Sequence, residues 1–315
     1  MLQSRKGLYK GILCITNDVE TTSIVNGGLR EDTGIKVWKE GLPMLLDLYD
    51  KYGVKATFFY IANFAKQHPE IVKMAQTKGH EVACHGLTHQ YDKAFDVMPY
   101  PEQLEHLKIA KKILEDIAGE EVVSFRAPAL RVNAETPKAL MEAGFKYDSS
   151  VAPQRMDMFM SLGSKNKFQW FGAPRVPYRT CVGNLARKGN SSIIEVPVSS
   201  FVVPYIGTFM RILPSLNALA RKLLYLETRN TNKAINFLIH PNEVITEENL
   251  HIKTQRRASS YVGYLLSDVL RRKLKQKNLG QDALALFEQE VEFWSNKGYL
   301  FKRIKDIEIC FRNAK

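Results

Sequence analysis

Short apolar runs rich in β-forming residues alternate with amphipathic helical patterns along most of this 315-residue sequence, and this order restricts the possible folds strongly. The runs that predict strands are residues 11–16, 55–60, 81–85, 122–125, 145–148, 193–198 and 234–240. The patterns that predict helices are residues 37–52, 69–78, 101–118, 134–143 and 209–227. Repeated strand-then-helix order predicts parallel strands joined by helical crossovers. Six or seven such units predict an α/β barrel.

The rest of the chain departs from this alternation in two places. Residues 152–190 are rich in Pro, Gly, Arg and aromatic residues with weak periodicity, which predicts long loops over the active face. From residue 243 onward the pattern is helical, with helices predicted at 258–277 and 282–297 before a short strand at 299–301. We therefore predict two units: a barrel over residues 1–245, and a basic, mainly helical C-terminal extension over 246–315 that packs on it.

Cysteine spacing and hydropathy indicate the expected compartment. The four cysteines form no CxxC pair, so neither a disulfide framework nor a thiolate zinc site is predicted. The first apolar run stops after five residues at Thr16, which is too short for a signal-peptide core. The apolar stretch 206–226 is interrupted by Pro and basic residues, so it is not predicted to cross a bilayer. We expect a cytoplasmic protein.

The formal net charge of +12 favours anionic partners, such as nucleic acid, an acidic lipid surface or a phosphate-bearing substrate. We expect no nucleic acid, because the sequence has no zinc finger, Rossmann or P-loop glycine pattern, or RNP motif. Residues 251–280 carry eight basic residues against one acid, Asp268. This region, with the basic helix around residues 211–222, is predicted to contact an anionic membrane; a solvated charged helix is the alternative.

Polar residues with catalytic chemistry follow the ends of five predicted strands. They are Asp18 and Glu20, His85 and His89, Arg126, Asp148, and His240. In a parallel barrel the carboxyl ends of all strands open on the same face, so we expect these residues to form one cluster. Among the other histidines, His80 begins its strand at the opposite face and is predicted to be structural. His68, His106 and His251 are predicted to be surface or helix residues.

The strand-end residues include the donor types of a catalytic metal site. Asp18 and Glu20 are two apart on an extended segment, so both can face the same way, where they need a cation, a shared proton or hydrogen bonds. His85 and His89 lie one turn apart, and a carboxylate from elsewhere would complete a three-ligand site with positions open for water. Taken singly, the acidic pair also fits a capped turn, and most HxxxH segments bind no metal. Cys84 should point away from His85, which makes a Cys–His nucleophile pair poor.

In their order along the chain, these motifs resemble those of the polysaccharide deacetylase family, which includes chitooligosaccharide deacetylase-like (NodB-homology) domains. The matching segments are Thr16-Asn17-Asp18-Val19-Glu20, His85 to His89, Arg126-Ala127-Pro128, Asp148-Ser149-Ser150 and Leu238-Ile239-His240. The resemblance covers roughly residues 11–245. It implies a distorted (β/α) barrel of about seven parallel strands.

The resemblance also implies roles for the site residues. One divalent ion would be held by Glu20, His85 and His89, with zinc expected and Co, Fe, Ni or Mn as alternatives. Asp18 would be the general base. Arg126 would orient it, His240 would be the general acid, and Asp148 would hold the His240 imidazole.

Two departures from the usual motifs leave questions open. The usual Asp-Asp is here Asp-Val-Glu, which resembles a branch whose third residue is the metal ligand and some of whose members work without metal. Which of Asp18 and Glu20 binds the ion therefore stays open. After Arg126-Ala127-Pro128 the sequence continues Ala129-Leu130, where many members have Gly or Tyr in the fifth position of the motif, so the shape of the acyl pocket is also open.

The implied activity is hydrolysis of an N-acetyl or related acyl group on a sugar. With no export signal expected, the predicted substrate is a cytosolic nucleotide- or lipid-linked precursor of a surface polysaccharide. Two alternatives share the fold: a metal-independent hydrolase of a non-sugar C–N amide bond, and a catalytically silent glycan-binding barrel. A metal requirement for activity would distinguish the sugar deacetylase from these two alternatives. The sequence predicts no oligomeric state.

Overall fold

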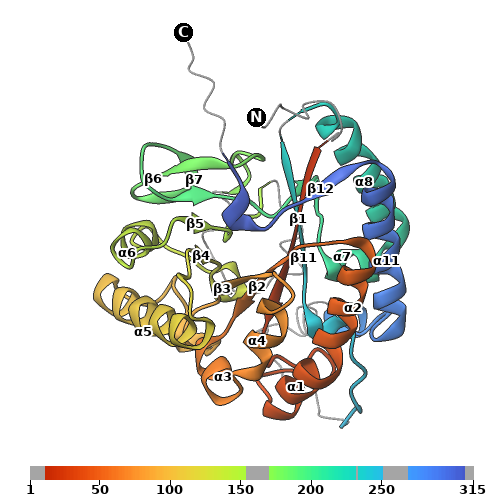
Figure 1. Cartoon of the computed structure of the whole chain (residues 1–315), viewed down its shortest axis with the longest axis horizontal. Helices are drawn as coiled ribbons and strands as arrows, with labels where there is room; N and C mark the ends of the chain where they lie inside the picture. The colour runs from red at the N-terminus through yellow and green to blue at the C-terminus, as the bar shows by residue number, and fades with distance from the viewer. Residues whose placement is uncertain (1–10, 154–169, 232, 251–268, 309–315) are drawn as a thin grey trace.

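The computed structural model of the chain describes residues 11–153, 170–231, 233–250 and 269–308. Its main sheet contains a continuous run of parallel strands, ordered β11-β1-β2-β3-β4-β5-β8 (Figure 1). Their bounds are β1 Gly11–Val19, β2 Thr57–Tyr60, β3 Glu81–Cys84, β4 Ser124–Phe125, β5 Tyr147–Asp148, β8 Ile194–Glu195 and β11 Ala234–Ile239. Seven strands in this run, within the described ranges, agree with the predicted number.

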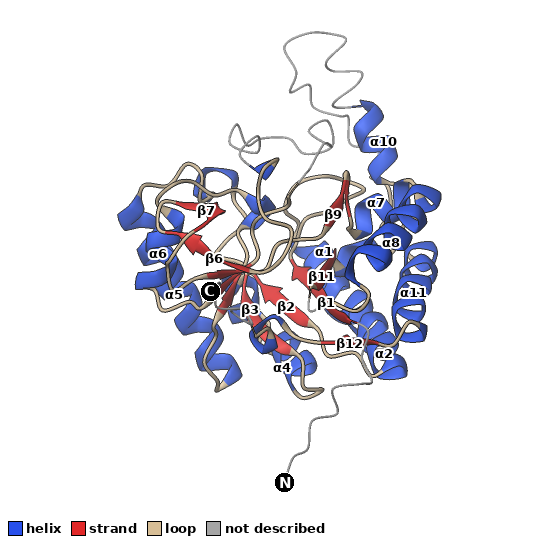
Figure 2. Ribbon diagram, turned by 90° about the horizontal axis from the view of Figure 1, so that it is seen from above, coloured by secondary structure: helices blue, strands red, loops and turns tan. Residues whose placement is uncertain are grey.

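Helices surround this sheet (Figure 2). They are α1 Glu31–Lys36, α2 Leu42–Tyr52, α3 Ala62–Gln67, α4 Glu70–Gln76, α5 Tyr100–Ala118, α6 Thr136–Glu142, α7 Gly207–Ile212, α8 Pro214–Thr228, α10 Arg271–Lys275 and α11 Gln281–Asn296. Helices α7, α8 and α11 lie beside β11 and the short strand β12, Tyr299–Phe301, whereas α5 and α6 lie beside β3 to β5 (Figure 1). A π-helical turn, Val37–Gly41, joins α1 to α2, so the first helical segment begins six residues before its predicted start.

The two longest strands of the described sheet, β1 and β11, are almost entirely buried. Strand β11 is buried along its whole length, and β1 is buried at all but one position, as expected of parallel strands covered on both sides. Just beyond β8 the chain returns to β11, where Ser199 N donates to Asn236 O at 2.9 Å. Asn236 N in turn donates to Ser199 Oγ at 2.9 Å. The distorted α/β barrel predicted from the sequence is confirmed.

The predicted loop region 152–190 is wrong in part. Within its described portion, β6 Tyr178–Cys181 and β7 Asn184–Lys188 form an antiparallel hairpin whose first strand pairs with β8. The two residues between these strands form a tight turn, and Tyr178 and Thr180 are buried while their neighbours are partly exposed. This alternation spans only four residues, too few to stand out from the surrounding irregular sequence. A second small hairpin, β9 Ser200–Phe201 with β10 Val203–Pro204, follows.

The predicted helix 209–227 is two helices. Leu213 has non-helical backbone angles between α7 and α8, φ −135° and ψ 67°, because the proline that follows it disfavours the helical conformation. Most of the predicted helix 258–277 lies outside the described residues. The C-terminal extension also adds a strand to the main sheet, since β12 Tyr299–Phe301 pairs in parallel with the start of β1. Trp294 and Phe287 of α11 are buried in the main core.

The amino ends of the strands are covered by the chain that follows β12. Ile304 N donates to Thr57 Oγ1 at 2.9 Å, and Lys305 N donates to the carboxylate of Glu81 at 3.0 Å. Glu81 also accepts from Thr57 Oγ1 at 2.7 Å and from Ser124 Oγ at 2.5 Å. This end of the barrel is therefore closed by a buried carboxylate with several donors. Among the described helices, none is both long and apolar enough to cross a membrane.

Candidate metal and catalytic site

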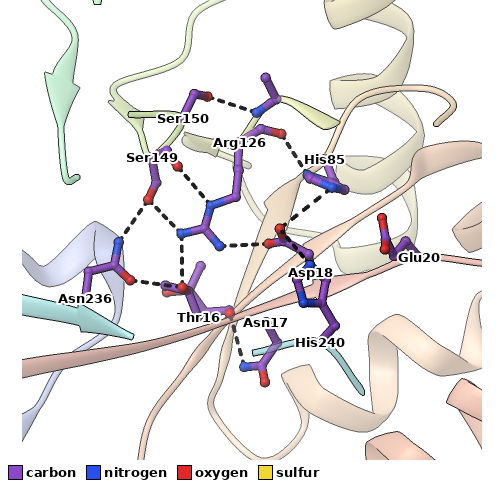
Figure 3. Close-up of polar contacts among 12 residues, drawn as sticks. Thr16, Asn17, Asp18, Glu20, His85, Arg126, Ser149, Ser150, Asn236 and His240 are labelled. Atoms are coloured by element: carbon purple, nitrogen blue, oxygen red, sulfur yellow. Dashed lines mark hydrogen bonds and ion pairs between the residues drawn. The ribbon is translucent and has the colours of Figure 1, made fainter. Parts of the chain in front are cut away.

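The opposite, carboxyl ends of the strands carry the polar cluster predicted from the sequence (Figure 3). Asp18 and Glu20 come from the end of β1, and His85 directly follows β3. Arg126 follows β4, and His240 follows β11. All five side chains are mostly buried within this end of the barrel. The parallel order of the strands therefore brings together residues up to 222 positions apart in the chain.

Glu20, His85 and His89 form a compact donor set. One donor atom from each residue lies within 4.8 Å of the other two, and Glu20 Oε2 lies 2.7 Å from His89 Nε2. His85 Nδ1 lies 2.9 Å from Arg126 O, so Nδ1 carries the proton and Nε2 keeps its lone pair. Burial lowers the pKa of His85 to about 4, which keeps the imidazole neutral at pH 7. Two imidazoles and a carboxylate are the donors that a catalytic zinc site uses, so the set fits a divalent ion.

The charge of Glu20 and His89 is consistent with such a site. Burial alone would raise the pKa of Glu20, but the neighbouring imidazoles, His89 above all, lower it. Burial alone would lower the pKa of His89, whereas Glu20 raises it. The carboxylate is therefore ionised and available as a ligand at neutral pH.

Asp18 lies close to His85 and is held in place by Arg126. Arg126 Nη1 donates to Asp18 Oδ1 at 2.7 Å, and the second carboxylate oxygen lies 3.8 Å from His85 Nε2. Burial would raise the pKa of Asp18, but the positive charge of Arg126 and the nearby histidines lower it. Asp18 is not part of the compact donor set; it is a buried, ionised carboxylate beside it.

Arg126 is fully buried and each of its nitrogens has an acceptor. Nε donates to Ser149 O at 2.9 Å, and Nη2 donates to Ser149 Oγ at 2.7 Å and to Thr16 Oγ1 at 3.0 Å. Its guanidinium lies 4.3 Å from the ring centroid of Phe59. Asn236 Nδ2 also donates to Ser149 Oγ at 2.9 Å (Figure 3). This network fixes the guanidinium that donates to Asp18.

His240 faces Asp18 with one nitrogen and Glu243 with the other. Nε2 lies 3.8 Å from Asp18 Oδ2, and Nδ1 lies 2.9 Å from Glu243 Oε1. Burial would lower the pKa of His240, but the hydrogen bond to Glu243 and the nearby carboxylates raise it to about 9. A protonated imidazole beside the cluster can donate a proton.

The prediction that Asp148 holds the His240 imidazole is wrong, because Glu243 makes that contact. Asp148 accepts from Ser150 Oγ at 2.7 Å and from Ser150 N at 3.2 Å. Its carboxyl group also pairs with that of Glu195, and burial raises the pKa of both. One proton shared between two buried acids explains this contact. A different role of Asp148 in turnover stays a prediction.

Sequence reasoning missed three contributors to the site. Glu243 could have been found from its i+3 spacing after His240. Arg211, which donates to Glu243, has no sequence signal for that contact. His106, predicted as a surface or helix residue, lies on α5 but is buried, and its Nε2 accepts from Leu87 N in the loop between His85 and His89 at 2.7 Å.

The other sequence expectations near the site have mixed outcomes. His80 is structural, since its Nδ1 accepts from Ala56 N at 3.0 Å. Cys84 is buried, and burial raises the pKa of its thiol to about 12, so it is no thiolate nucleophile. Ala129 and Leu130 both have positive φ, 52° and 54°, directly after the Arg126 motif. This departure from the usual family sequence is thus accompanied by a left-handed turn.

Comparisons with known proteins agree with these geometric findings. A sequence model of the polysaccharide deacetylase family matches residues 32–147, a range that contains His85, His89 and Arg126. Peptidoglycan deacetylase from Helicobacter pylori is 30% identical over 118 residues, which are 38% of this chain and 39% of that protein. The match thus spans about two fifths of the relative's length.

Solved structures show the same fold over nearly the whole chain. A probable polysaccharide deacetylase from Pseudomonas aeruginosa superposes with a TM-score of 0.61 at 17% identity, covering 95% of this chain and 89% of that one. The Puue allantoinase superposes with a TM-score of 0.60 at 16% identity, with the same coverage. The fold is therefore shared by proteins with different names for their activity. Residues 32–147 of this chain are therefore similar to the polysaccharide deacetylase family, and the site is assembled around them.

Proposed function

We propose that this protein is a carbohydrate N-deacetylase, a hydrolase that removes an acyl group from an N-acylated sugar. The observation that carries the proposal is the joint arrangement at the carboxyl ends of the strands. A three-residue donor set, Glu20, His85 and His89, lies beside the Asp18–Arg126 pair, and His240 faces the same carboxylate. A deacetylase needs a polarised carbonyl, an activated water and a proton for the leaving amine, and this arrangement has a candidate for each.

In the proposed mechanism, Glu20, His85 and His89 hold one divalent ion. When bound, the ion would supply Lewis-acid polarisation of the acyl carbonyl and lower the pKa of a water. Asp18, ionised and fixed by Arg126, accepts the proton of the attacking water. His240 donates a proton to the departing sugar amine. Zinc is the expected ion, because two imidazoles and a carboxylate with open positions suit it, although Co, Fe, Ni and Mn take similar donors.

Charge supports a phosphate-bearing substrate. The net charge of +12 attracts anions to the surface of the protein and raises their local concentration. We propose a nucleotide-linked or lipid-linked N-acetylated sugar in preference to a neutral oligosaccharide. An assay of acetate release from both kinds of sugar tests this point: faster turnover of the neutral oligosaccharide at every salt concentration contradicts it.

Membrane contact stays a prediction, and the structure changes which residues can make it. Arg211 is fully buried against Glu243, so it cannot reach a lipid surface, contrary to the sequence expectation for residues 211–222. Residues 251–268 lie outside the described part of the chain. Co-sedimentation with anionic vesicles at low and high salt is the test, and no pelleting at low salt contradicts it.

The experiment that tests the proposed function is removal of one donor. His89→Ala should lower bound metal to well below one ion per chain and abolish acetate release together. The control is His68→Ala, since that imidazole packs against Trp38 and Phe64 at the end of α3. Elemental analysis and an acetate assay on N-acetylglucosamine oligomers and nucleotide-linked N-acetylglucosamine provide the readouts.

The outcomes separate the alternative functions. Unchanged metal content in His89→Ala contradicts the ligand set. Activity on a cyclic or other non-sugar amide in the metal-free protein favours the metal-independent amide hydrolase. Sugar binding without acetate release, with metal bound, favours a silent glycan-binding barrel.

A further inference from the structure

We propose that Glu243 is the positioning residue of His240 and that Arg211 and the chain around residues 275–277 hold Glu243 in place. The inference rests on the proposed function, in which His240 is the general acid. The sequence predicts that Asp148 holds the His240 imidazole, and the proposal assigns this role to Glu243. It also makes the C-terminal extension part of the catalytic apparatus.

The Glu243 carboxylate sits between two cationic groups. Oε1 is 2.9 Å from His240 Nδ1, and Oε2 accepts from Arg211 Nε at 2.7 Å. The side chains of Glu243 and Arg211 are each only 1% exposed. A buried carboxylate bonded on one oxygen to an arginine stays ionised, and its other oxygen is free to accept the imidazole proton.

Arg211 is itself anchored by the C-terminal extension. Its Nη1 donates to Lys275 O at 2.8 Å and to Lys277 O at 2.7 Å, where α10 ends. The last carbonyls of a helix lack partners within the helix and carry partial negative charge, so a guanidinium is a favourable donor there. Asn278 Nδ2 donates back to Arg211 O at 2.8 Å. Arg211 therefore connects α7, the end of α10 and the residue that contacts His240.

The space around Glu243 is shaped for its carboxylate. A side-chain carbon placed on Gly207 would lie 2.7 Å from Glu243 Oε2, so a larger residue here would displace the carboxylate from its place between Arg211 and His240. Gly280 N donates to Glu243 O at 3.0 Å and fixes its backbone. Thr208 Oγ1 lies 3.3 Å from Oε1. Arg211 and Thr208 thus bond the Glu243 side chain, Gly280 bonds its backbone, and Gly207 leaves room for the carboxylate.

The chemical consequence concerns the orientation and charge of the imidazole. Accepting the Nδ1 proton fixes the ring so that Nε2 faces Asp18 Oδ2 at 3.8 Å, on the side of the metal donor set. The negative charge of Glu243 stabilises the imidazolium that a general acid must be before it donates. Burial would raise the pKa of Glu243, yet Arg211 and His240 lower it to about 2, so the carboxylate is ionised at neutral pH, where the imidazole is charged.

The extension reaches a second part of the site as well. Gln276 Nε2 and Arg272 Nη2 both donate to Val25 O, at 2.8 and 2.9 Å. Val25 lies in the loop between Glu20 and α1. Residues 271–280 therefore contact both the loop that follows the metal donor Glu20 and the residue that holds the general acid. Displacement of this segment should disturb both at once.

The test compares Glu243→Gln with Glu290→Gln. Glu290 is a matched control, because it is also buried and bonded to an arginine, Arg221, at 3.0 Å, but it has no histidine partner among the described residues. Glu243→Gln should lower kcat by about 100-fold, with KM changed less than two-fold and metal content unchanged. Glu290→Gln should leave kcat within about three-fold of the wild type at equal folded fraction.

A second readout needs neither substrate nor metal. In the metal-free protein, NMR titration of His240 reports the charges that face it: Asp18 and Glu20 from β1 and Glu243 from its own segment, with Arg211 behind Glu243. Glu243→Gln should lower the pKa of His240 by one unit or more. The shift is expected even if the protein proves not to be a deacetylase, so the two proposals fail separately.

Further variants keep the proposal open to refutation. If Glu243→Gln does not fold, Glu243→Asp retains the charge but shortens the reach, and it should give the same loss of kcat. Arg211→Lys should reduce kcat less than Glu243→Gln does, because an ammonium can still face the carboxylate. An unchanged kcat and an unchanged His240 pKa in Glu243→Gln, while His240→Ala is inactive, overturn the proposal. Equal losses in Glu243→Gln and Glu290→Gln also overturn it.

Discussion

The two ends of the barrel each bury a carboxylate, and they treat it in opposite ways. At the carboxyl ends of the strands, Asp18 is paired with Arg126 and faces two histidines, so its pKa is lowered despite burial. At the amino ends, Glu81 is surrounded by hydroxyl and amide donors, and burial, its largest influence, raises its pKa. The first carboxylate is kept charged beside groups that can exchange protons. The second is enclosed by neutral donors of the protein.

This difference separates a reactive end from a structural end of one sheet. The donors to Glu81 come from two other strands and from the chain after β12, so the contact ties the C-terminus of the domain to the barrel. Asp18 has one oxygen bonded to Arg126, while the other faces histidines at 3.8 Å, too far for a hydrogen bond. Substitutions at the two ends should therefore affect activity and stability differently.

The largest expected effect is on turnover at the reactive end. Asp18→Asn should lower kcat by about 10³-fold, because it removes the proposed base while Arg126 keeps the side chain in place. Bound metal should stay near the wild-type level, since the donor set is Glu20, His85 and His89. Metal analysis together with acetate release checks both points. Loss of the metal in Asp18→Asn would mean that the assignments of Asp18 and Glu20 must be exchanged.

The next effect is on stability at the structural end. Glu81→Leu should lower the free energy of unfolding by about 3 kcal/mol, because two hydroxyls and one backbone amide lose their acceptor. Glu81→Gln keeps an acceptor oxygen and should cost about 1 kcal/mol. Urea denaturation measures both, and kcat per folded molecule should be unchanged. A drop in kcat for Glu81→Gln at full folding would contradict the separation of the two ends.

As the pH falls, Glu243 at the reactive end should contribute less to the stability of the fold, whereas Glu81 at the structural end should contribute more. The pKa of Glu243 in the folded protein is about 2. It lies below the usual 4.5, so its contribution is complete above pH ~4.5 and is lost as the pH falls toward ~2. The pKa of Glu81 is raised by burial, so the folded protein binds that proton more tightly, and this group favours folding more as the pH falls.

The measurement is urea denaturation of the wild type, Glu243→Gln and Glu81→Gln between pH 6 and pH 3. The stability difference between the wild type and Glu243→Gln should shrink by roughly 1–2 kcal/mol across this range, as the partial loss of a contribution worth 1.36 kcal/mol per pKa unit. The wild type should improve relative to Glu81→Gln over the same range. If the free energy of unfolding changed with pH in the same way in all three proteins, the proposed electrostatic difference between the two ends would be wrong.

The smallest effect should come from a surface ion pair next to Glu81. Lys305 Nζ lies 3.2 Å from Glu120 Oε2, and both side chains are partly exposed. Lys305→Ala should cost less than about 1 kcal/mol, because exposed pairs contribute little and the backbone amide still donates to Glu81. A thermal melt should place this variant close to the wild type. A loss as large as that of Glu81→Leu would show that the side chain, and not the backbone amide, closes this end.

Periodicity in the sequence was sufficient to predict the strands and helices that build the barrel, since the long buried strands β1 and β11 are mostly apolar. It failed where elements are short. The four-residue strand β6 gives too little alternation, and α3 Ala62–Gln67 is a six-residue helix with no predicted counterpart. The break between α7 and α8 could have been read from Pro214, whose effect on the preceding residue is local.

By itself, the sequence determined which residues gather at the carboxyl ends of the strands. The parallel order of the strands requires Asp18, His85, Arg126 and His240 to meet, whatever the details of packing. The spacing of His85 and His89 also predicted that both imidazoles can bind one metal ion.

Tertiary structure alone decided which carboxylate serves which partner. Asp148 ends β5 and Glu243 follows β11, and the sequence does not say which one reaches His240 Nδ1. The choice depends on side-chain direction and on Arg211, which lies 32 residues before Glu243 and is anchored by carbonyls 64 and 66 residues after itself. Asp148 is instead drawn to Glu195 on the adjacent strand, where two buried acids share a proton. Such contacts depend on the precise relative position of segments that are far apart in the sequence. No local sequence pattern encodes that position.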